Sequence, residues 1–206
     1  MATITFYSSE TGTGSAWASA STFPLARSST WTNKSNTSWN TAWGSFDAGA
    51  LKYCYRGFFP FYVTWIPAGA TITSAVFSVY LYGTVGTPTM GLILTTQTDP
   101  TSLAVGDYDN LTLDTPSEGA TRVSVTDASY NDFTLNATGL SWLPTPWTDG
   151  YIKLGTREAR DIDNGLNSTD TYSNARFSDY SGTASDPKLV ITYTVPSTFT
   201  PKIIIC

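Results

Sequence analysis

Apolar side chains recur at every second position along several stretches of this chain. No stretch keeps the 3.6-residue period of an amphipathic helix for three turns, so the pattern is typical of strands. In the clearest stretch, residues 71–82, Ala75, Phe77, Val79 and Leu81 alternate with serine, valine and tyrosine. Because residues two apart on a strand share a face, we expect these four to face the core. Further strands are predicted at 3–7, 52–65, 89–95, 121–125, 133–137, 150–156 and 187–195.

The composition of the chain is also typical of a β protein. Hydrophobic residues make up 41% of the 206 residues and charged residues only 13%, with 12 Tyr, 10 Phe and 7 Trp, and aromatic residues suit pleated, half-buried surfaces. Long connections at 8–49 and 97–119 favour Greek-key or jelly-roll crossings over a simple meander. We therefore predict an all-β protein, a jelly-roll-like antiparallel β-sandwich formed by one domain over residues 1–195. Its Trp- and Thr-rich stretch 11–49 is expected to be irregular.

The segment 196–206 follows the predicted closing strand and contains three consecutive isoleucines and a cysteine. Pro196 and Pro201 keep it out of helix, so we expect an extended C-terminal tail with a strand-forming end. Two placements are open: the tail folds back on its own domain, or it adds as a strand to a neighbouring copy. The residues that would mediate the second placement are Phe199, Ile203, Ile204, Ile205 and Cys206.

The charge of the chain restricts its partners. The net charge is −5 and the 11 basic residues are scattered, whereas nucleic acids and anionic membranes bind clustered lysine and arginine. No apolar run approaches the ~20 residues of a spanning helix, and the first residues lack the pattern of a signal peptide. We expect no nucleic-acid partner and no membrane insertion. The protein is then either assembled inside a cell, as virion proteins are, or exported after removal of a leader that the sequence omits.

A motif with a defined turn lies in the middle of the chain. From Arg56 the sequence runs RGFFPFYVTWIPAGATITSAVFSVYLYG, in which Pro67 and Gly69 suit a turn, and a closing segment PKLVITY begins at Pro187. Here the chain resembles the DNRLRE-type family, whose modules carry an arginine-led strand, an IP.GA.I.SA turn and a closing P.L.ITY strand. The resemblance covers roughly residues 52–195. It implies a jelly-roll-like fold found in cell-surface and phage structural proteins, usually without catalytic activity.

The chain contains no histidine, which removes Ser-His-Asp and Cys-His catalysis and every histidine-containing metal site. Glu158, Asp161 and Asp163 are close enough in sequence for the paired carboxylates of glycoside hydrolysis to be considered. The oxygen ligands of Asp161, Asp163 and Asn164 also suit a calcium-binding loop, although the spacing of an EF-hand is missing. An ordinary turn rich in Asp and Asn is the simplest alternative. We expect a protein that is not an enzyme and has no cofactor, with calcium at this loop as the alternative.

Two further groups of residues suit sugar chemistry. The first group consists of tryptophans and tyrosines. Aromatic faces stack on sugar rings, so these side chains could form a sugar-binding platform. The alternative is that they are buried in the core. The platform residues are Trp31, Trp39, Trp43, Tyr80 and Tyr82. Asn-x-Ser/Thr triplets would accept glycans if the protein passed through a glycosylating route. They begin at Asn33, Asn36, Asn110, Asn136 and Asn167.

Two functions agree with these features. The first is a non-enzymatic structural subunit that self-assembles through its tail into an extracellular filament or a virion appendage. The second is a carbohydrate-binding or adhesion module, whose partners are glycans. The apolar segment 196–206 favours the first, because a polymer needs a connector and a binding module does not. Cys54 and Cys206 either form a bridge, or are one buried thiol and one incidental residue.

Overall fold

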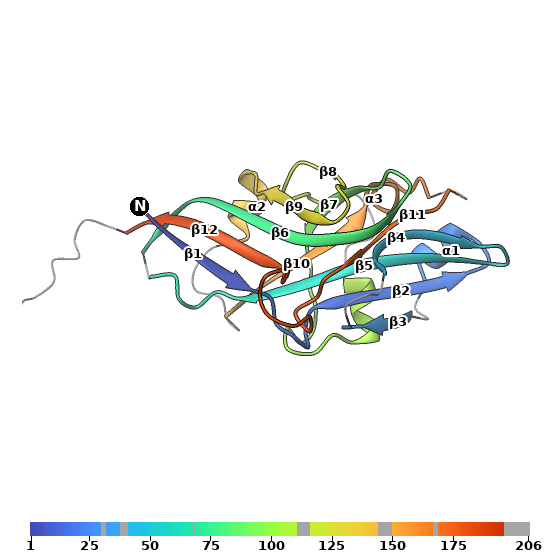
Figure 1. Cartoon of the computed structure of the whole chain (residues 1–206), viewed down its shortest axis with the longest axis horizontal. Helices are drawn as coiled ribbons and strands as arrows, with labels where there is room; N and C mark the ends of the chain where they lie inside the picture. Colours follow the sequence, from blue (N-terminus) through green and yellow to red (C-terminus); the bar gives the residue numbers. More distant parts are fainter. Residues whose placement is uncertain are drawn as a thin grey trace, which may run out of the picture.

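The computed structural model describes residues 1–29, 32–37, 41–67, 69–110, 116–143, 150–166 and 169–195 (Figure 1). Strands account for 51% of the residues and helices for 11%, so the prediction of an all-β, antiparallel fold is confirmed. The strands are β1 (Ala2–Tyr7), β2 (Gly14–Ala20), β3 (Thr32–Ser35), β4 (Thr41–Ala48), β5 (Leu51–Tyr62), β6 (Thr71–Val85), β7 (Thr89–Leu94), β8 (Val123–Ser124), β9 (Ser129–Thr134), β10 (Tyr151–Glu158), β11 (Thr171–Ala175) and β12 (Lys188–Thr194). The helices are α1 (Phe23–Arg27), the 3₁₀ helix η1 (Val105–Asn110), α2 (Ala137–Ser141) and α3 (Ala159–Ile162). No helix in this part of the chain is long and apolar enough to cross a bilayer.

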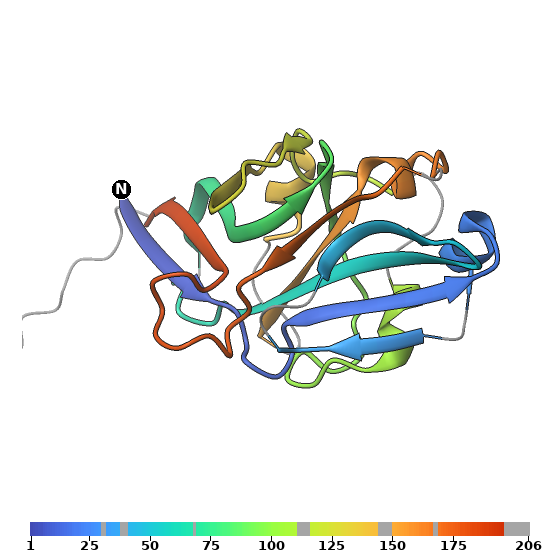
Figure 2. The same ribbon diagram turned by 45° about the vertical axis from the view of Figure 1, so that its right-hand side comes forward.

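The strands of the described residues belong to one hydrogen-bonded sheet that curls on itself (Figures 1 and 2). Its main path runs β1-β12-β6-β11-β4-β5-β10-β7-β8, while β9 pairs with β6, β2 with β5, and β3 with β2. The long strands β5 and β6 hold the curled sheet together. Each of them pairs with one set of strands along its first half and with another set along its second half. β6, for example, pairs with β12 along Thr71–Ser78 and with β11 along Leu81–Val85. The jelly-roll arrangement stays a prediction.

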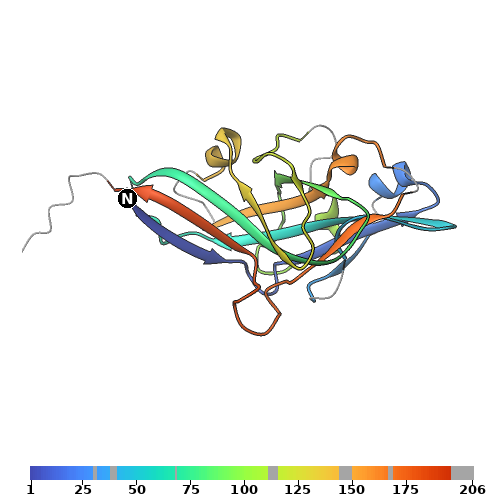
Figure 3. The ribbon, with the colours of Figure 1, turned by 45° about the horizontal axis from the view of Figure 1, so that its top comes forward.

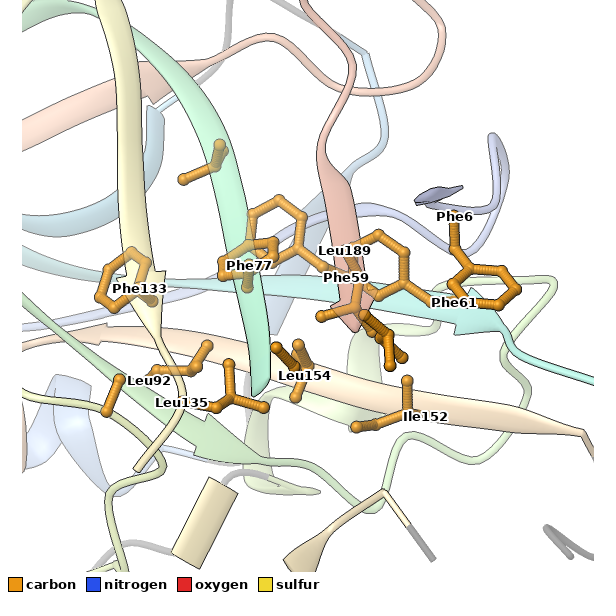
Figure 4. Packing of buried hydrophobic residues seen from close by; sticks show 14 of the residues in the cluster. Phe6, Phe59, Phe61, Phe77, Leu92, Phe133, Leu135, Ile152, Leu154 and Leu189 are labelled. Atoms are coloured by element: carbon orange, nitrogen blue, oxygen red, sulfur yellow. The ribbon is translucent and has the colours of Figure 1, made fainter. Parts of the chain in front are cut away.

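The main core lies inside the curl, with β6, β9 and β12 on one side and β5, β7 and β10 on the other (Figure 4). The alternation predicted for residues 71–82 is confirmed, because all four expected inward residues are buried. Leu189 and Ile191 of β12 join them, whereas Tyr193 is only half-buried. Other members of this core are Phe59, Phe61, Leu92, Phe133, Ile152 and Leu154.

A smaller core covers the opposite face of β5. Cys54 and Phe58 pack there with Ala16 and Ala18 of β2 and with Tyr108 of η1. Both faces of β5 are therefore covered. This explains why its second half has the continuous apolar run Phe58–Phe61 and not a simple alternation.

The prediction that residues 11–49 are irregular is wrong. The described residues of this stretch contain β2, α1, β3 and β4, and both β2 and β4 pair with β5. The alternation missed these strands because small residues stand at their core positions: Ala16 and Ala18 are fully buried, and Gly44 interrupts β4 with φ 125. Helix α1 begins after Thr22, whose hydroxyl accepts a hydrogen bond from the Leu25 amide at 3.4 Å.

The turn between β5 and β6 forms as the motif predicts. The Ala70 amide donates to the Pro67 carbonyl at 3.0 Å, and Gly69 has φ 79, a conformation that favours glycine. Ile66 is buried in the main core at the start of the turn. The turn therefore returns the chain as β6 with its apolar face already directed inward.

Candidate functional site

One end of the molecule combines an unpaired strand edge with exposed apolar side chains. β1 pairs with β12 along its whole length, and no described strand pairs with its other edge. Just after β1 the chain meets β5 at the bridge between Ser8 and Phe61 and through the Ser9 amide, which donates to the Pro60 carbonyl at 3.0 Å. An unpaired edge presents backbone donors and acceptors that can bind a further strand. We call this region the assembly end. It comprises β1 and the exposed residues Met1, Tyr7, Tyr62, Trp65 and Val195.

Strand pairing gathers the segments of the assembly end. Ala2 pairs with Tyr193, which places the start of β1 beside the end of β12, and Thr194 pairs with Thr71 at the start of β6. Figure 3 shows the N-terminus, the end of β12 and the turn between β5 and β6 at one end of the sheet. Trp65 lies in that turn and is 73% exposed. Large apolar side chains that are exposed together mark an interaction surface.

The acidic segment considered for catalysis or calcium contains a buried ion cluster. Asp161 of α3 is fully buried, and its carboxylate accepts hydrogen bonds from Arg56 at 2.9 and 3.1 Å and from Arg157 at 2.6 and 2.8 Å. Arg27 of α1 approaches the same carboxylate at 3.3 Å. Burial by itself raises the pKa of Asp161, but Arg56 and Arg157 hold it well below its usual range. Asp161 is therefore an ionised structural anchor that joins α1, β5, β10 and α3.

The neighbouring acidic residues also have arginine partners. Asp163 accepts two hydrogen bonds of 2.6 Å from Arg122, and Glu158, whose pKa burial raises, accepts one of 3.0 Å from Arg160. Asn164 has φ 55, which is typical of a turn rich in Asp and Asn. Because arginines engage these carboxylates, neither the calcium interpretation nor the glycosidase pair fits this segment. Within the described ranges, no group of three His, Cys, Asp or Glu side chains is placed to hold a metal.

Three of the five residues considered for a sugar platform lie in the described part of the chain. Trp43 is fully buried in the main core, so the platform interpretation is wrong for this residue. Tyr80 and Tyr82 are half-buried on β6 and pack against neighbouring side chains. Trp31 and Trp39 lie outside the described residues.

The predicted glycan acceptors differ in exposure. Asn33 on β3 and Asn136 are exposed, whereas Asn36 is half-buried. The Asn136 side chain is already engaged, because its oxygen caps α2 at 3.0 Å and its nitrogen donates to a backbone carbonyl at 3.0 Å. The side chain of Asn110 and all of Asn167 lie outside the described residues.

Cys54 is a free, fully buried cysteine in the smaller core. Burial raises the pKa of its thiol to about 12, so the thiol stays protonated and unreactive. The residues predicted to mediate assembly lie outside the described part of the chain, and their role stays a prediction. They are Phe199, Ile203, Ile204, Ile205 and Cys206.

An aromatic strip that was not predicted crosses the sheet from β2 to β11. It consists of Trp17, Phe46, Tyr53, Tyr55 and Tyr172, each half-buried. Ring centroids are 5.6 Å apart for Trp17 and Tyr55 and 6.2 Å apart for Tyr53 and Tyr55, and both pairs are stacked. The sequence contains one signal for the strip, since Tyr53 and Tyr55 alternate with residues of the smaller core and must share the opposite face.

A pocket of about 270 Å³ opens in the aromatic strip, lined by Thr41, Phe46, Tyr55, Tyr172 and Asn174. All five lining residues are uncharged. Burial raises the pKa of Tyr55 to about 12, so its hydroxyl stays protonated. Aromatic rings with hydroxyl and amide groups beside them suit a neutral ligand that has both an apolar face and polar edges.

Asp186 makes stability depend on pH. It is buried, its Oδ1 atom has no hydrogen-bond partner among the described residues, and burial beside Glu10 and Asp179 raises its pKa to about 6. A raised pKa means that the folded protein favours the protonated form, so stability is full below about pH 4 and falls as the pH rises through about 6. Asp186→Asn should therefore increase the free energy of unfolding by about 1–3 kcal/mol at pH 7 and change it little at pH 4. Urea unfolding from pH 4 to 8 measures this, and a pH-independent difference contradicts it.

The sequence matches no protein-family model, and no curated protein is significantly similar to it. The resemblance to the DNRLRE-type family therefore rests on the motif itself. Two parts of that motif have clear structural roles, because Arg56 belongs to the buried ion cluster and Gly69 forms the turn into β6.

Proposed function

We propose that this protein is a non-enzymatic structural subunit that assembles with copies of itself by strand addition. Segment 196–206 of one copy is the donor, and the outer edge of β1 in the next copy is the acceptor. The observation that carries the proposal is the unpaired β1 edge, which lies among the exposed apolar residues of the assembly end. The missing histidine and the arginine-bound carboxylates support a role without catalysis.

The end of β12 brings the donor segment to an unpaired strand edge. β12 ends at Thr194 beside the start of β1, so the donor segment begins at the assembly end of its own subunit. Each copy then has one donor and one acceptor. Donation from copy to copy builds an open filament or a closed ring, whereas reciprocal donation between two copies builds a dimer. The assembly we propose is an extracellular filament or a virion appendage.

Burial of side chains alone would give weak association. Three isoleucines contribute about 1.5–3 kcal/mol each, or about 5–9 kcal/mol in total. Association costs at least several kcal/mol in lost freedom of motion. Backbone hydrogen bonds along the six residues of β1 would add to the apolar contribution and cover the exposed edge. Residues 199–205 are one residue longer than that edge and can therefore span it.

Deleting residues 196–206 should abolish assembly and leave a folded monomer, because both cores keep all their described side chains. Size-exclusion chromatography with light scattering and negative-stain microscopy measure assembly, and thermal unfolding reports the fold. If the segment instead binds its own domain, deletion lowers the melting temperature and leaves the oligomeric state unchanged. A truncated protein that still polymerises contradicts the proposal.

Disulfide cross-linking of the full chain tests β1 as the acceptor. The native Cys206 is combined with Ala2→Cys or with Tyr7→Cys, at the two ends of β1, so antiparallel and parallel addition give different results. Cys54 is buried and should not react. One of the two variants should give a ladder of linked copies on oxidation, whereas Ser124→Cys, exposed on β8, should give none. The absence of a ladder from both β1 variants contradicts this acceptor.

A further inference from the structure

We propose that the pocket in the aromatic strip binds one sugar ring of a neutral polysaccharide. The pocket is lined by residues of β4, β5 and β11, whereas assembly is assigned to β1. Figure 1 shows where these strands lie. The two proposals therefore concern different surfaces, and either one can fail without the other.

The pocket opens beside Gly44. Tyr55 of β5 and Tyr172 of β11 both pair with Gly44 of β4, from its two sides. The Tyr172 Cα and Cβ atoms lie 2.5 and 2.7 Å from the place that a Gly44 side chain would take, so only glycine leaves room for Tyr172 here. The rings of Phe46 and Tyr172 are 6.0 Å apart with their edges and faces in contact. Together with Tyr55, these rings give the pocket aromatic surfaces on which the face of a sugar ring can pack.

The backbone at position 44 requires glycine. Its φ of 125 is a conformation that favours glycine, and a Cβ at this position would meet the carbonyl oxygen of Thr171 in β11. On the β2 side, Trp17 stacks on Tyr55 with an angle of 26° between the ring planes. Trp17 therefore supports one wall of the pocket from behind.

The polar groups of the pocket match sugar hydroxyls. Thr41 and Asn174 pair across β4 and β11, so a hydroxyl and an amide lie together at one end of the pocket. Neither side chain forms a hydrogen bond with another residue in the part of the chain that the structure describes. Together they offer donors and acceptors, which ring hydroxyls need in both directions.

The size and charge of the pocket define the ligand class. A volume of about 270 Å³ is at the lower end for small-molecule sites, and it suits one ring better than an extended ligand. With no charged side chain in the lining, a phosphate or carboxylate group would lose hydration without gaining an ionic partner. A neutral hexose unit combines an apolar C–H face for Tyr55 and Tyr172 with hydroxyl edges for Thr41 and Asn174.

Isothermal titration of the full-length protein with cellohexaose, xylohexaose, mannohexaose and isomaltohexaose tests the proposal. At least one of these should bind, and Tyr55→Ala and Tyr172→Ala should each weaken that binding about tenfold. Tyr55→Phe keeps the ring and should retain most of the affinity. Trp65→Ala, which removes a larger and more exposed aromatic residue at the assembly end, is the matched control and should bind as the wild type does.

Circular dichroism checks that each variant is folded. If Tyr55→Ala does not fold, Asn174→Ala replaces it, with an expected loss of about fivefold from missing hydrogen bonds. The proposal is overturned if none of the four hexasaccharides binds at millimolar concentration. It is equally overturned if folded pocket variants bind as tightly as the wild type.

Discussion

Replacing Asp161 with asparagine should lower the free energy of unfolding by about 3–5 kcal/mol. The substitution keeps the shape of the side chain but removes the negative charge to which Arg56 and Arg157 donate and which Arg27 approaches. The side chains of Arg56 and Arg157 are fully buried, so water cannot replace the lost charge. Urea unfolding at pH 7 measures the change.

Asp163→Asn is the matched control for that experiment. Asp163 lies two residues away and also binds an arginine, Arg122, but its side chain is 55% exposed. Solvent screens an exposed ion pair, so the loss should stay below about 1 kcal/mol. Equal losses from the two substitutions would mean that burial of the Asp161 cluster does not determine its contribution.

The effect of Asp161→Asn should also depend on pH in a defined direction. Because Arg56 and Arg157 hold the pKa of Asp161 well below its usual range, its stabilising contribution is full above about pH 4. The contribution is lost as the pH falls toward the lowered pKa. The stability difference between wild type and variant should therefore be smaller at pH 2.5 than at pH 7, and an unchanged difference would argue against an ionised Asp161.

Phe77→Ala should lower the free energy of unfolding by about 3–5 kcal/mol. The Phe77 ring is fully buried, and its centroid lies 5.1 Å from that of Phe59, 5.9 Å from Phe61 and 5.7 Å from Phe133. Its removal leaves a cavity between the two sides of the curled sheet, where these rings lose contacts. Ser74→Ala, exposed on the same strand, should change stability by less than about 0.5 kcal/mol. An unchanged urea midpoint for Phe77→Ala would mean that this ring is not central to the core.

Alternation located strands wherever large apolar side chains fill the inward positions. β6 and β12 satisfy this condition through Phe77, Leu81, Leu189 and Ile191. β2 and β4 do not, because alanine and glycine at core positions look in sequence like the small residues of a loop. Their strand conformation depends on the backbone ladders that they form with β5.

The sequence also did not show which aromatic residues lie at the surface. Trp17 and Trp43 occur in similar stretches rich in Ser, Thr and Ala, yet Trp17 supports the pocket wall and Trp43 is fully buried in the core. Which of them reaches the surface depends on the neighbouring strands that cover it. The sequence therefore could not show that Trp43 is buried and that Trp17 reaches the aromatic strip.

The sequence alone was sufficient to predict the all-β class, the inward face of β6 and the turn at Pro67 and Gly69. It was also sufficient to exclude catalysis by histidine. Each of these conclusions depends on composition or on residues that are close in sequence. The ion cluster required the folded chain, since Asp161 lies 134 residues from Arg27 and 105 from Arg56. No local pattern indicates which distant charges will meet. The pocket in the aromatic strip likewise exists only after β11 pairs with β4, because that pairing brings Tyr172 to the side of Gly44 opposite Tyr55.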